Sequence, residues 1–512
     1  MLVKTYGGAV QGVDATLITI EVSVSKGKDF YLVGLPDKAI QEAKIRIDTA
    51  LKNINFHSPK KKTVVNMAPA DLKKEGAVYD LPIAIGILGA TDQVNKEKLK
   101  DYFMMGELSL DGKIQPIKGA LPISILAKEL GFKGIILPFE NAKEAAIVSE
   151  LDVYGFKTIK EVIEFCDGSE KAKPVYLNTR QQFSEQLDQS EFDFADVKGQ
   201  ENIKRAMEVA AAGGHNLILI GPPGTGKTML ARRLSSILPP MTLREALETT
   251  KIHSVAGKLG SQFGLVAHRP FRSPHHTISD VALIGGGTNP KPGEVSMAHN
   301  GVLFLDELPE FKRTVLEVLR QPLEDRNVSI ARAKFSVEYP ASLMLIASMN
   351  PCPCGYYNHP EKECICPGGT VQKYLNKISG PLLDRIDLHI EVSPISFDEL
   401  SNSKSCEKSE FIRERVIKAR KIQTSRYAKF DKVHSNAQMN PAHIETYCSL
   451  TSECKSLLKN AMNKFDLSAR AYNRILKVAR TIADLEGLNQ IDTSHIAEAI
   501  QFRSLDRDNW AG

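Results

Sequence analysis

The stretch Asn216-Leu217-Ile218-Leu219-Ile220-Gly221-Pro222-Pro223-Gly224-Thr225-Gly226-Lys227-Thr228 decides the fold of the central part of this chain. Its apolar run predicts a buried strand, and the glycines after it predict a tight turn into a helix. A strand, turn and helix of this kind point several backbone N–H groups inward and form a cradle for phosphate oxygens. All four fixed positions of G-x-x-x-x-G-K-[ST] are present, which favours a nucleoside-triphosphate-binding loop over a chance glycine-rich turn.

Each position of this phosphate loop has an expected role. The glycines let the backbone approach the phosphates, and Lys227 is placed to reach the β- and γ-phosphates. The Thr228 hydroxyl is placed to ligate the Mg²⁺ ion that bridges those phosphates. We therefore expect ATP and Mg²⁺ as cofactors. The predicted nucleotide-binding residues are Gly221, Pro222, Pro223, Gly224, Thr225, Gly226, Lys227, Thr228 and Met229.

Length and composition set the broad class of protein. The chain of 512 residues is too long for one hydrophobic core and implies roughly three or four structural units. Its 42% hydrophobic and 25% charged residues are typical of globular proteins, and its net charge of +5 selects no partner. No apolar run approaches the ~20 residues of a membrane-spanning helix. Because the N-terminus lacks a signal-peptide pattern, we expect a cytoplasmic protein without a membrane partner.

The predicted fold class is α/β, in three parts. Residues 1–166 alternate strand-like and helical runs, including an expected helix at 38–53, and form an α/β domain. Residues 167–191 lose periodicity and predict a linker. Residues 192–395 alternate helices with short apolar strands, as in a P-loop core built on a parallel sheet. Residues 396–512 predict a small helical lid. The helices expected in this last part span residues 411–429, 451–465, 468–486 and 493–501.

Two other predicted strands end in polar residues suited to ATP hydrolysis. After the strand at 301–305, Asp306 would hold Mg²⁺ and Glu307 would orient or deprotonate the attacking water. The strand at 343–349 ends at Asn350, whose amide could bond both the γ-phosphate and that water. The alternatives are an acidic pair that closes a buried strand and an ordinary turn asparagine, and the phosphate loop upstream favours the functional interpretation.

Arginines supply a second group of candidate catalytic residues. Arg385 lies between apolar residues before a predicted strand, where a planar, permanently charged guanidinium could stabilise phosphoryl transfer, commonly in a neighbouring subunit. A salt bridge to Asp384 or Asp387 is the alternative. Arg470, at the start of a C-terminal helix, is a second candidate for the γ-phosphate, and Arg474 lies one turn later.

A cysteine-rich loop occupies residues 351–369. Cys352, Cys354, Cys364 and Cys366 offer four thiolates, enough for a tetrahedral Zn²⁺ site. His359 could replace one of these cysteines, and four reduced thiols in an irregular insertion are the alternative. Since the loop leaves directly from Asn350, a metal there could couple the nucleotide state to whatever the loop contacts.

Several basic residues are candidates for contact with DNA phosphates, which requires little more than positive charge. For each set alone a solvated basic face is the alternative. His275 and His276 are adjacent, and on a strand their rings would point apart, which argues against a shared metal. The candidate DNA-contacting residues are Arg269, Arg272, Arg332 and Lys334, with Arg326, the two histidines and the basic helix at 413–432 as further members.

In combination these motifs resemble the YifB/ComM family of magnesium-chelatase-like AAA+ ATPases. The resemblance implies a ring, a homo-hexamer, with ATP at subunit interfaces and Arg385 and Arg470 acting in trans. It also implies activity on DNA as a branch-migration helicase in natural transformation. A motor subunit of magnesium chelatase, which remodels a metal-inserting partner, is the alternative. Besides the phosphate loop, the resemblance depends on residues 269–276, 285–287, 292–296, 301–309, 350–355 and 379–387.

The first domain resembles the proteolytic domain of Lon, through residues 74–84 and 106–117. A Lon-type protease requires a serine that is activated by a lysine. Val78 and Leu121 stand at those two positions here, and neither side chain can perform the chemistry. The resemblance therefore predicts a non-proteolytic platform that helps form the ring or faces DNA.

Overall fold

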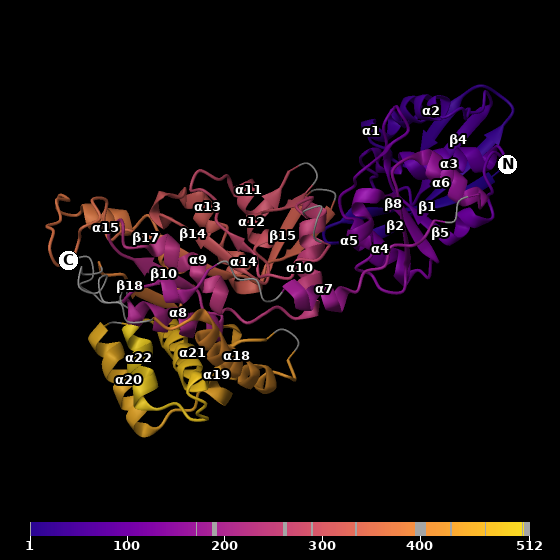
Figure 1. The fold of residues 1–512 in the computed structure, drawn as a ribbon. Helices are drawn as coiled ribbons and strands as arrows, with labels where there is room; N and C mark the ends of the chain where they lie inside the picture. Colours follow the sequence, from indigo (N-terminus) through magenta and orange to yellow (C-terminus); the bar gives the residue numbers. More distant parts are fainter. Residues whose placement is uncertain are drawn as a thin grey trace.

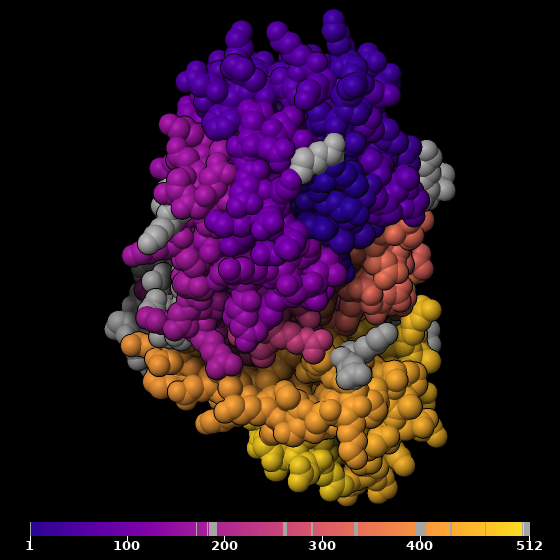
Figure 2. Space-filling view, turned by 90° about the vertical axis from the view of Figure 1, so that its right-hand side faces the viewer, coloured from indigo at the N-terminus to yellow at the C-terminus, as the bar shows by residue number. Residues whose placement is uncertain are grey.

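The computed structural model places the N-terminal α/β unit beside a central core, with the C-terminal helices packed below that core (Figure 1). From the side of the N-terminal unit, this unit stands in front of the core (Figure 2). Among the described residues, no helix has both the length and the apolar character needed to cross a bilayer. The structure describes residues 2–169, 172–186, 192–259, 264–287, 290–332, 335–394, 406–430, 433–465, 467–503 and 505.

The N-terminal unit is built on a seven-stranded sheet with strand order β3-β4-β2-β1-β5-β8-β9. Alternate residues of β2, including Ile18, Ile20 and Val22, are fully buried, as the period of two in a strand requires. The strands are β1 (Leu2–Gln11), β2 (Asp14–Ser25), β3 (Phe30–Val33), β4 (Lys62–Ala68), β5 (Tyr102–Met104), β8 (Gly134–Pro138) and β9 (Asp152–Phe156), with a separate pair β6 (Glu107–Leu108) and β7 (Ile114–Gln115).

Helices of this unit pack on the sheet. Every residue of α3 is buried, which explains its continuous apolar sequence. The expected helix at 38–53 is two helices, because Glu42 caps the first and precedes the second. The helices are α1 (Lys38–Gln41), α2 (Ala43–Asn53), α3 (Asp80–Ala90), α4 (Ala120–Glu129), α5 (Ala142–Ala145) and α6 (Ile159–Asp167).

The central core contains a five-stranded sheet with strand order β11-β14-β17-β10-β18. All its neighbouring strands are parallel, as the sequence predicts. The carboxyl ends of β10, β14 and β17 therefore meet at one edge, and the phosphate loop leaves from that edge. The strands are β10 (Leu217–Ile220), β11 (Phe271–Arg272), β14 (Val302–Leu305), β17 (Met344–Met349) and β18 (Leu388–Glu391).

Helices and a hairpin surround this sheet. The hairpin joins β15 (Asn327–Arg332) to β16 (Phe335–Pro340) in antiparallel register, with Asn327 opposite Pro340. A second short pair joins β12 (Gly285–Gly286) to β13 (Lys291–Pro292). The helices are α8 (Glu201–Gly213), α9 (Lys227–Ile237), α10 (Leu243–Ala256), α11 (Asp280–Ile284), α12 (Glu294–Met297), α13 (Arg313–Glu317), α14 (Arg320–Asp325), α15 (Thr370–Leu375) and α16 (Gly380–Leu383).

The C-terminal part is helical, and its helices share one buried cluster with α8 and one face of the central sheet. Leu217 and Leu388 of the sheet belong to the same cluster as Ile475 and Ile482 of α21. The predicted helices are present, and α19 is an additional short one whose N-cap is Asn440. The helices are α18 (Ser409–Arg426), α19 (Pro441–Tyr447), α20 (Ser452–Phe465), α21 (Ala469–Leu485) and α22 (Thr493–Gln501).

The N-terminal unit meets the core mainly through α10. The Ser254 hydroxyl of α10 donates to the Glu144 carboxylate, and the backbone N–H of Gly119 donates to the Ser254 carbonyl over 3.1 Å. Burial raises the pKa of Glu144. Helix α7 (Thr179–Gln186) lies inside the predicted linker, and Thr179 donates to the Ile147 carbonyl. A small apolar cluster at this junction contains Leu121, Ile147, Met241, Ala246 and Leu265.

Candidate nucleotide-binding site

The phosphate loop has the backbone that its glycines permit. Gly224 and Gly226 adopt φ angles of 82° and 80°, in the left-handed region that glycine enters without strain, and Gly226 caps α9. A side chain at Gly221 would lie 2.4 Å from the carbonyl oxygen of Val392. The loop borders a cavity of about 450 Å³, which is of the size usual for ligand sites. Its lining residues are Pro223, Gly224, Thr225, Gly226, Lys227, Thr228, Met229, Asp306, Glu307, Ser348, Met349 and Asn350.

Lys227 lies at the floor of this cavity. Its Nζ donates to the carbonyls of Gly221 and Pro222 at 2.7 and 2.8 Å and to Oδ1 of Asn350 at 3.2 Å. Burial lowers the pKa of the Lys227 ammonium. These contacts hold the Lys227 ammonium beside the Asn350 amide. A γ-phosphate in the cavity would be contacted by both of these side chains.

Thr228 and Asp306 form the oxygen-rich side of the cavity. The Thr228 hydroxyl donates to Oδ2 of Asp306 at 2.7 Å, and the Ser348 hydroxyl donates to Oδ1 of the same carboxylate. Hydroxyl and carboxylate oxygens are the ligands that Mg²⁺ prefers, so this donor set fits the expected ion. The sequence interpretation did not include Ser348. The pairing of Leu305 with Ala347 in the sheet could have identified it, because the next residues along the two strands are Asp306 and Ser348.

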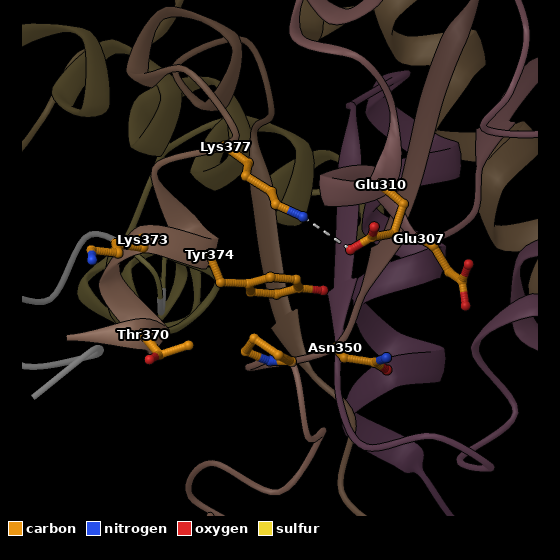
Figure 3. Close-up of a pocket in the computed structure, with 8 residues that line it drawn as sticks. Glu307, Glu310, Asn350, Thr370, Lys373, Tyr374 and Lys377 are labelled. Atoms are coloured by element: carbon orange, nitrogen blue, oxygen red, sulfur yellow. Dashed lines mark hydrogen bonds and ion pairs between the residues drawn. The ribbon is translucent and has the colours of Figure 1, made fainter. Parts of the chain in front are cut away.

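Glu307 adopts a left-handed backbone conformation with φ of 54°, which is uncommon for a residue other than glycine. Its side chain is 57% exposed, and its Oε2 lies 3.7 Å from Nδ1 of His276. The side chains of Glu307 and Asn350 extend to the same side, away from Tyr374 (Figure 3). This arrangement leaves the Glu307 carboxylate accessible to a water molecule in front of the phosphate loop.

The expectation that His275 and His276 point apart is wrong. Their ring centroids lie 4.1 Å apart, because β11 ends at Arg272 and the two histidines follow it in a loop. Nδ1 of His276 thereby lies 3.7 Å from Oε2 of Glu307, a contact that the sequence did not predict. Its imidazole is therefore a positioning candidate for the glutamate.

Arg385 lies at the opposite end of the sheet from its own phosphate loop. The Asn216 side chain donates to the Arg385 carbonyl at 2.8 Å, and Asn216 directly precedes β10 whereas the phosphate loop directly follows it. A strand of this length separates its two ends by about 13 Å. The Arg385 guanidinium pairs with Glu324 and donates to the Pro381 carbonyl, so its partner is neither Asp384 nor Asp387.

Arg470 lies at the same end of the sheet as Arg385. Its side chain is 70% exposed, and Nη1 lies 2.8 Å from Oδ2 of Asp384. Arg474, one turn later, pairs instead with the buried Asp387 at 2.7 Å. Neither arginine borders the cavity of its own phosphate loop.

Asp387 is the centre of a buried polar network that the sequence interpretation missed. Nδ1 of the His215 ring is hydrogen-bonded to the Asp387 carboxylate at 3.0 Å, and Nε2 is hydrogen-bonded to the Thr481 hydroxyl at 2.8 Å. These two bonds tie the segments next to β18 and α8 to α21. Burial alone would raise the pKa of Asp387, but Arg474 and His215 hold it well below its ordinary value of 3.8. The network fixes the segment that carries Arg385.

Replacing Arg474 with alanine should destabilise the protein by about 3–5 kcal/mol, because it leaves Asp387 buried without its cation. In the wild type the stabilisation from Asp387 is present above its unfolded-state pKa and is lost as the pH falls below about 4. Thermal unfolding at pH 7, and at about pH 2 where much of this stabilisation is gone, measures both effects. Arg470→Ala is the matched control, since loss of its exposed ion pair should leave the unfolding temperature nearly unchanged. Equal unfolding temperatures for the two variants would contradict this assignment.

The four cysteines of the predicted zinc loop lie together. Their sulfur atoms are all within 4.8 Å of one another. The Sγ of Cys352 lies 3.3 Å from that of Cys354 and 3.7 Å from that of Cys364, and the last two are 3.6 Å apart. These separations are too long for disulfide bonds. His359 instead accepts backbone hydrogen bonds from Glu361 and Lys362.

Two of the candidate DNA-contacting arginines make contacts within the chain. Arg269 donates to the carbonyls of Pro239 and Asn300 and to the Glu245 carboxylate. Arg272 pairs with Glu294 through two hydrogen bonds of 2.6 and 2.8 Å. For Arg332, at the end of β15, only the backbone belongs to the described part of the chain, and Lys334 lies outside the described residues.

Family models match three parts of the chain. The model described as magnesium chelatase, subunit ChlI, matches residues 193–400, which include the phosphate loop, Asp306, Glu307 and Asn350. The model described as subunit ChlI of Mg-chelatase matches residues 20–141, and the ChlI C-terminal model matches residues 406–503.

Curated relatives extend the similarity to the full chain. Competence protein ComM of Haemophilus influenzae is 46% identical, over 99% of this chain and 98% of its own length. The uncharacterized protein YifB of Escherichia coli is 42% identical, over 98% of this chain and 96% of its own. Lon protease 2 of Bacillus subtilis is 31% identical over 28% of this chain and 27% of its own. The chain belongs to the YifB/ComM family of magnesium-chelatase-like AAA+ proteins.

Proposed function

We propose that this protein is an ATP-hydrolysing ring motor that acts on DNA. In this proposal Lys227, Thr228, Asp306, Glu307 and Asn350 act within one subunit. The geometry of the phosphate loop supports the ATP site, because a cavity of suitable size is bordered by a lysine, an oxygen-rich Mg²⁺ site and an exposed glutamate. Mg²⁺ would supply charge neutralisation at the phosphates.

The position of Arg385 supports a ring, and it is the observation that carries the proposal. Its carbonyl is bonded to Asn216 at the amino end of β10, whereas the phosphate loop leaves the carboxyl end. An arginine so placed can assist hydrolysis only in another subunit. The exposed Arg470 beside Asp384 presents a second guanidinium from the same end of the sheet. We propose a homo-hexamer in which both act in trans.

An equal mixture of Lys227→Ala and Arg385→Ala proteins should regain ATPase activity, although each variant alone should have almost none. In mixed rings about a quarter of the interfaces combine an intact phosphate loop with a neighbour's intact Arg385. ATPase rates of the mixture and of each variant give the comparison. Arg320→Ala, which removes a surface ion pair with Glu317, is the matched arginine control and should stay active. A mixture no more active than its components would show that Arg385 does not act in trans.

The DNA part of the proposal depends on the relatives and on the hairpin. The full-length relative from Haemophilus influenzae is named a competence protein, and uptake of DNA is what competence means. We propose the ComM-like role of a branch-migration helicase in natural transformation. The β15–β16 hairpin precedes β17 in the chain and includes Arg332 at the end of β15; it is the candidate DNA-contacting element.

The three parts of the chain, and the linker between the first two, receive proposed roles. Residues 1–166 form a Lon-protease-like domain without proteolytic activity, 167–191 a linker, 192–395 the AAA+ core and 396–512 a helical lid. Val78 is an apolar side chain in the short helix Ala77–Tyr79, and Leu121 is fully buried at the junction with α10, which supports the absence of a serine–lysine pair at these positions. We also propose Zn²⁺ as a second metal, held by the four clustered cysteines.

The alternative is a motor subunit that remodels a metal-inserting partner, as the ChlI family descriptions would indicate. DNA binding across a salt series separates the two. A motor on DNA should bind single-stranded, duplex and four-way-junction DNA with an affinity that falls steeply as salt rises, because phosphate contacts release counterions. Fluorescence anisotropy with labelled DNA measures this. No salt-dependent binding to any of the three DNAs would contradict the proposal and favour the alternative.

A further inference from the structure

The cysteine loop contacts the nucleotide site at its first turn. Gly355 has φ of 86°, and a side chain added there would lie 2.6 Å from Cδ of Pro223 in the phosphate loop. The N–H of Gly355 donates to the Cys352 carbonyl at 3.0 Å, which closes a tight turn around the first two cysteines. Because Cys352 is fully buried, this turn forms a fixed wall against Pro223.

The loop also returns to the site at its far end. Tyr374 lies in α15, directly after the loop, and burial raises the pKa of its phenol. Tyr374, Pro353 and Asn350 border a second cavity of about 370 Å³, which also contains Glu307 (Figure 3). The first turn of the cysteine loop and the helix that follows the loop therefore both lie beside the proposed nucleotide site.

The sulfur positions fit a single tetrahedral metal ion. Four thiolates at about 2.3 Å from Zn²⁺ stand at the corners of a tetrahedron with edges of about 3.8 Å. The sulfur–sulfur separations of 3.3, 3.6 and 3.7 Å are close to that edge. The sulfurs lie too close together to surround a multi-iron cluster, since all are within 4.8 Å. Cys352 and Cys354 belong to the first part of the loop, the proximal arm, and Cys364 and Cys366 belong to its later part, the distal arm. A bound ion therefore joins the two arms of the loop.

We propose that Zn²⁺ at these cysteines holds Gly355 against Pro223 and so sets the affinity of the phosphate loop for nucleotide. Without the ion the proximal arm, Cys352 to Gly355, loses its tie to the distal arm, and the wall behind Pro223 relaxes. The nucleotide affinity of the protein then depends on metal. This inference rests on the proposed ATP site but not on the proposed action on DNA.

The test uses the full-length protein and two readouts, zinc content by elemental analysis and binding of a fluorescent ATP analogue. The wild type should contain about one zinc per chain. A Cys364→Ser/Cys366→Ser variant, altered only in the distal arm, should lose zinc and bind the analogue about tenfold more weakly. Gly355→Ala should keep zinc and also bind more weakly, because its new methyl group meets Pro223. Cys406→Ser, a cysteine outside the cluster, is the control and should change neither readout.

Zinc extraction and add-back on the wild type guard against a folding defect in the serine variant. Affinity should fall on extraction and return when zinc is restored. The proposal would be overturned if the wild type, purified with zinc supplied, contained no zinc. It would also be overturned if removal of zinc, or the Gly355→Ala substitution, left the affinity for the ATP analogue unchanged. Absence of nucleotide binding in the zinc-loaded wild type would instead refute the proposed ATP site. Failure of DNA to bind would refute only the DNA part of the proposed function.

Discussion

Replacement of Lys227 by alanine should abolish ATP hydrolysis and weaken nucleotide binding by at least about a hundredfold. The Nζ of Lys227 is held by the Gly221 and Pro222 carbonyls and by Asn350, at the floor of the cavity. Among the described residues that border the cavity, Lys227 is the one cation. An equilibrium titration with a fluorescent ATP analogue and a steady-state ATPase assay measure the two effects.

The matched control is Arg232→Ala, which removes a cation from the exposed face of the same helix α9. It should keep wild-type binding and hydrolysis, so the loss in Lys227→Ala cannot be assigned to a damaged helix. Hydrolysis by Lys227→Ala at a rate within tenfold of wild type would show that the phosphate loop is not the catalytic site.

The second large effect is expected for Glu307→Gln. The amide cannot take a proton from water, so the rate of hydrolysis should fall by about a hundredfold or more. ATP binding should remain, because Glu307 is not among the groups that hold Lys227 or Thr228. The variant should therefore trap ATP on an assembled ring, visible as retained nucleotide after gel filtration and as a larger particle mass.

Glu310→Gln is the control for charge near this site. Glu310 borders the neighbouring cavity and pairs with Lys377 at 3.2 Å, so its loss should leave hydrolysis within about twofold of wild type. If Glu310→Gln were the inactive variant and Glu307→Gln were active, the assignment of the water-activating carboxylate would be wrong.

Local sequence signals predicted the part of the site that lies on adjacent strand ends. The strand at Leu217–Ile220 and its phosphate loop follow from an apolar run and glycines. Asp306 and Asn350 follow from their places after β14 and β17, because parallel strands bring their carboxyl ends to one edge. The contacts of Lys227 with Asn350 and of Thr228 with Asp306 agree with that expectation.

Contacts between distant segments could not be predicted in the same way. Arg385 pairs with Glu324, whereas the sequence offered Asp384 and Asp387, which are much nearer along the chain, as its salt-bridge partners. The network of His215, Asp387 and Thr481 joins residues that are up to 266 positions apart. β11 ends at Arg272, so His276 lies in the loop after it, 3.7 Å from Glu307, and the end of so short a strand is not predicted by periodicity.

We propose that ATP hydrolysis in this protein is coupled to DNA. The most direct measurement is the steady-state ATPase rate of the wild type with and without single-stranded, duplex and four-way-junction DNA, from low to high salt. We expect stimulation by at least one of these DNAs, lost as salt rises and absent in Glu307→Gln. An ATPase rate that is the same with and without every DNA, in a protein that hydrolyses ATP, would contradict it.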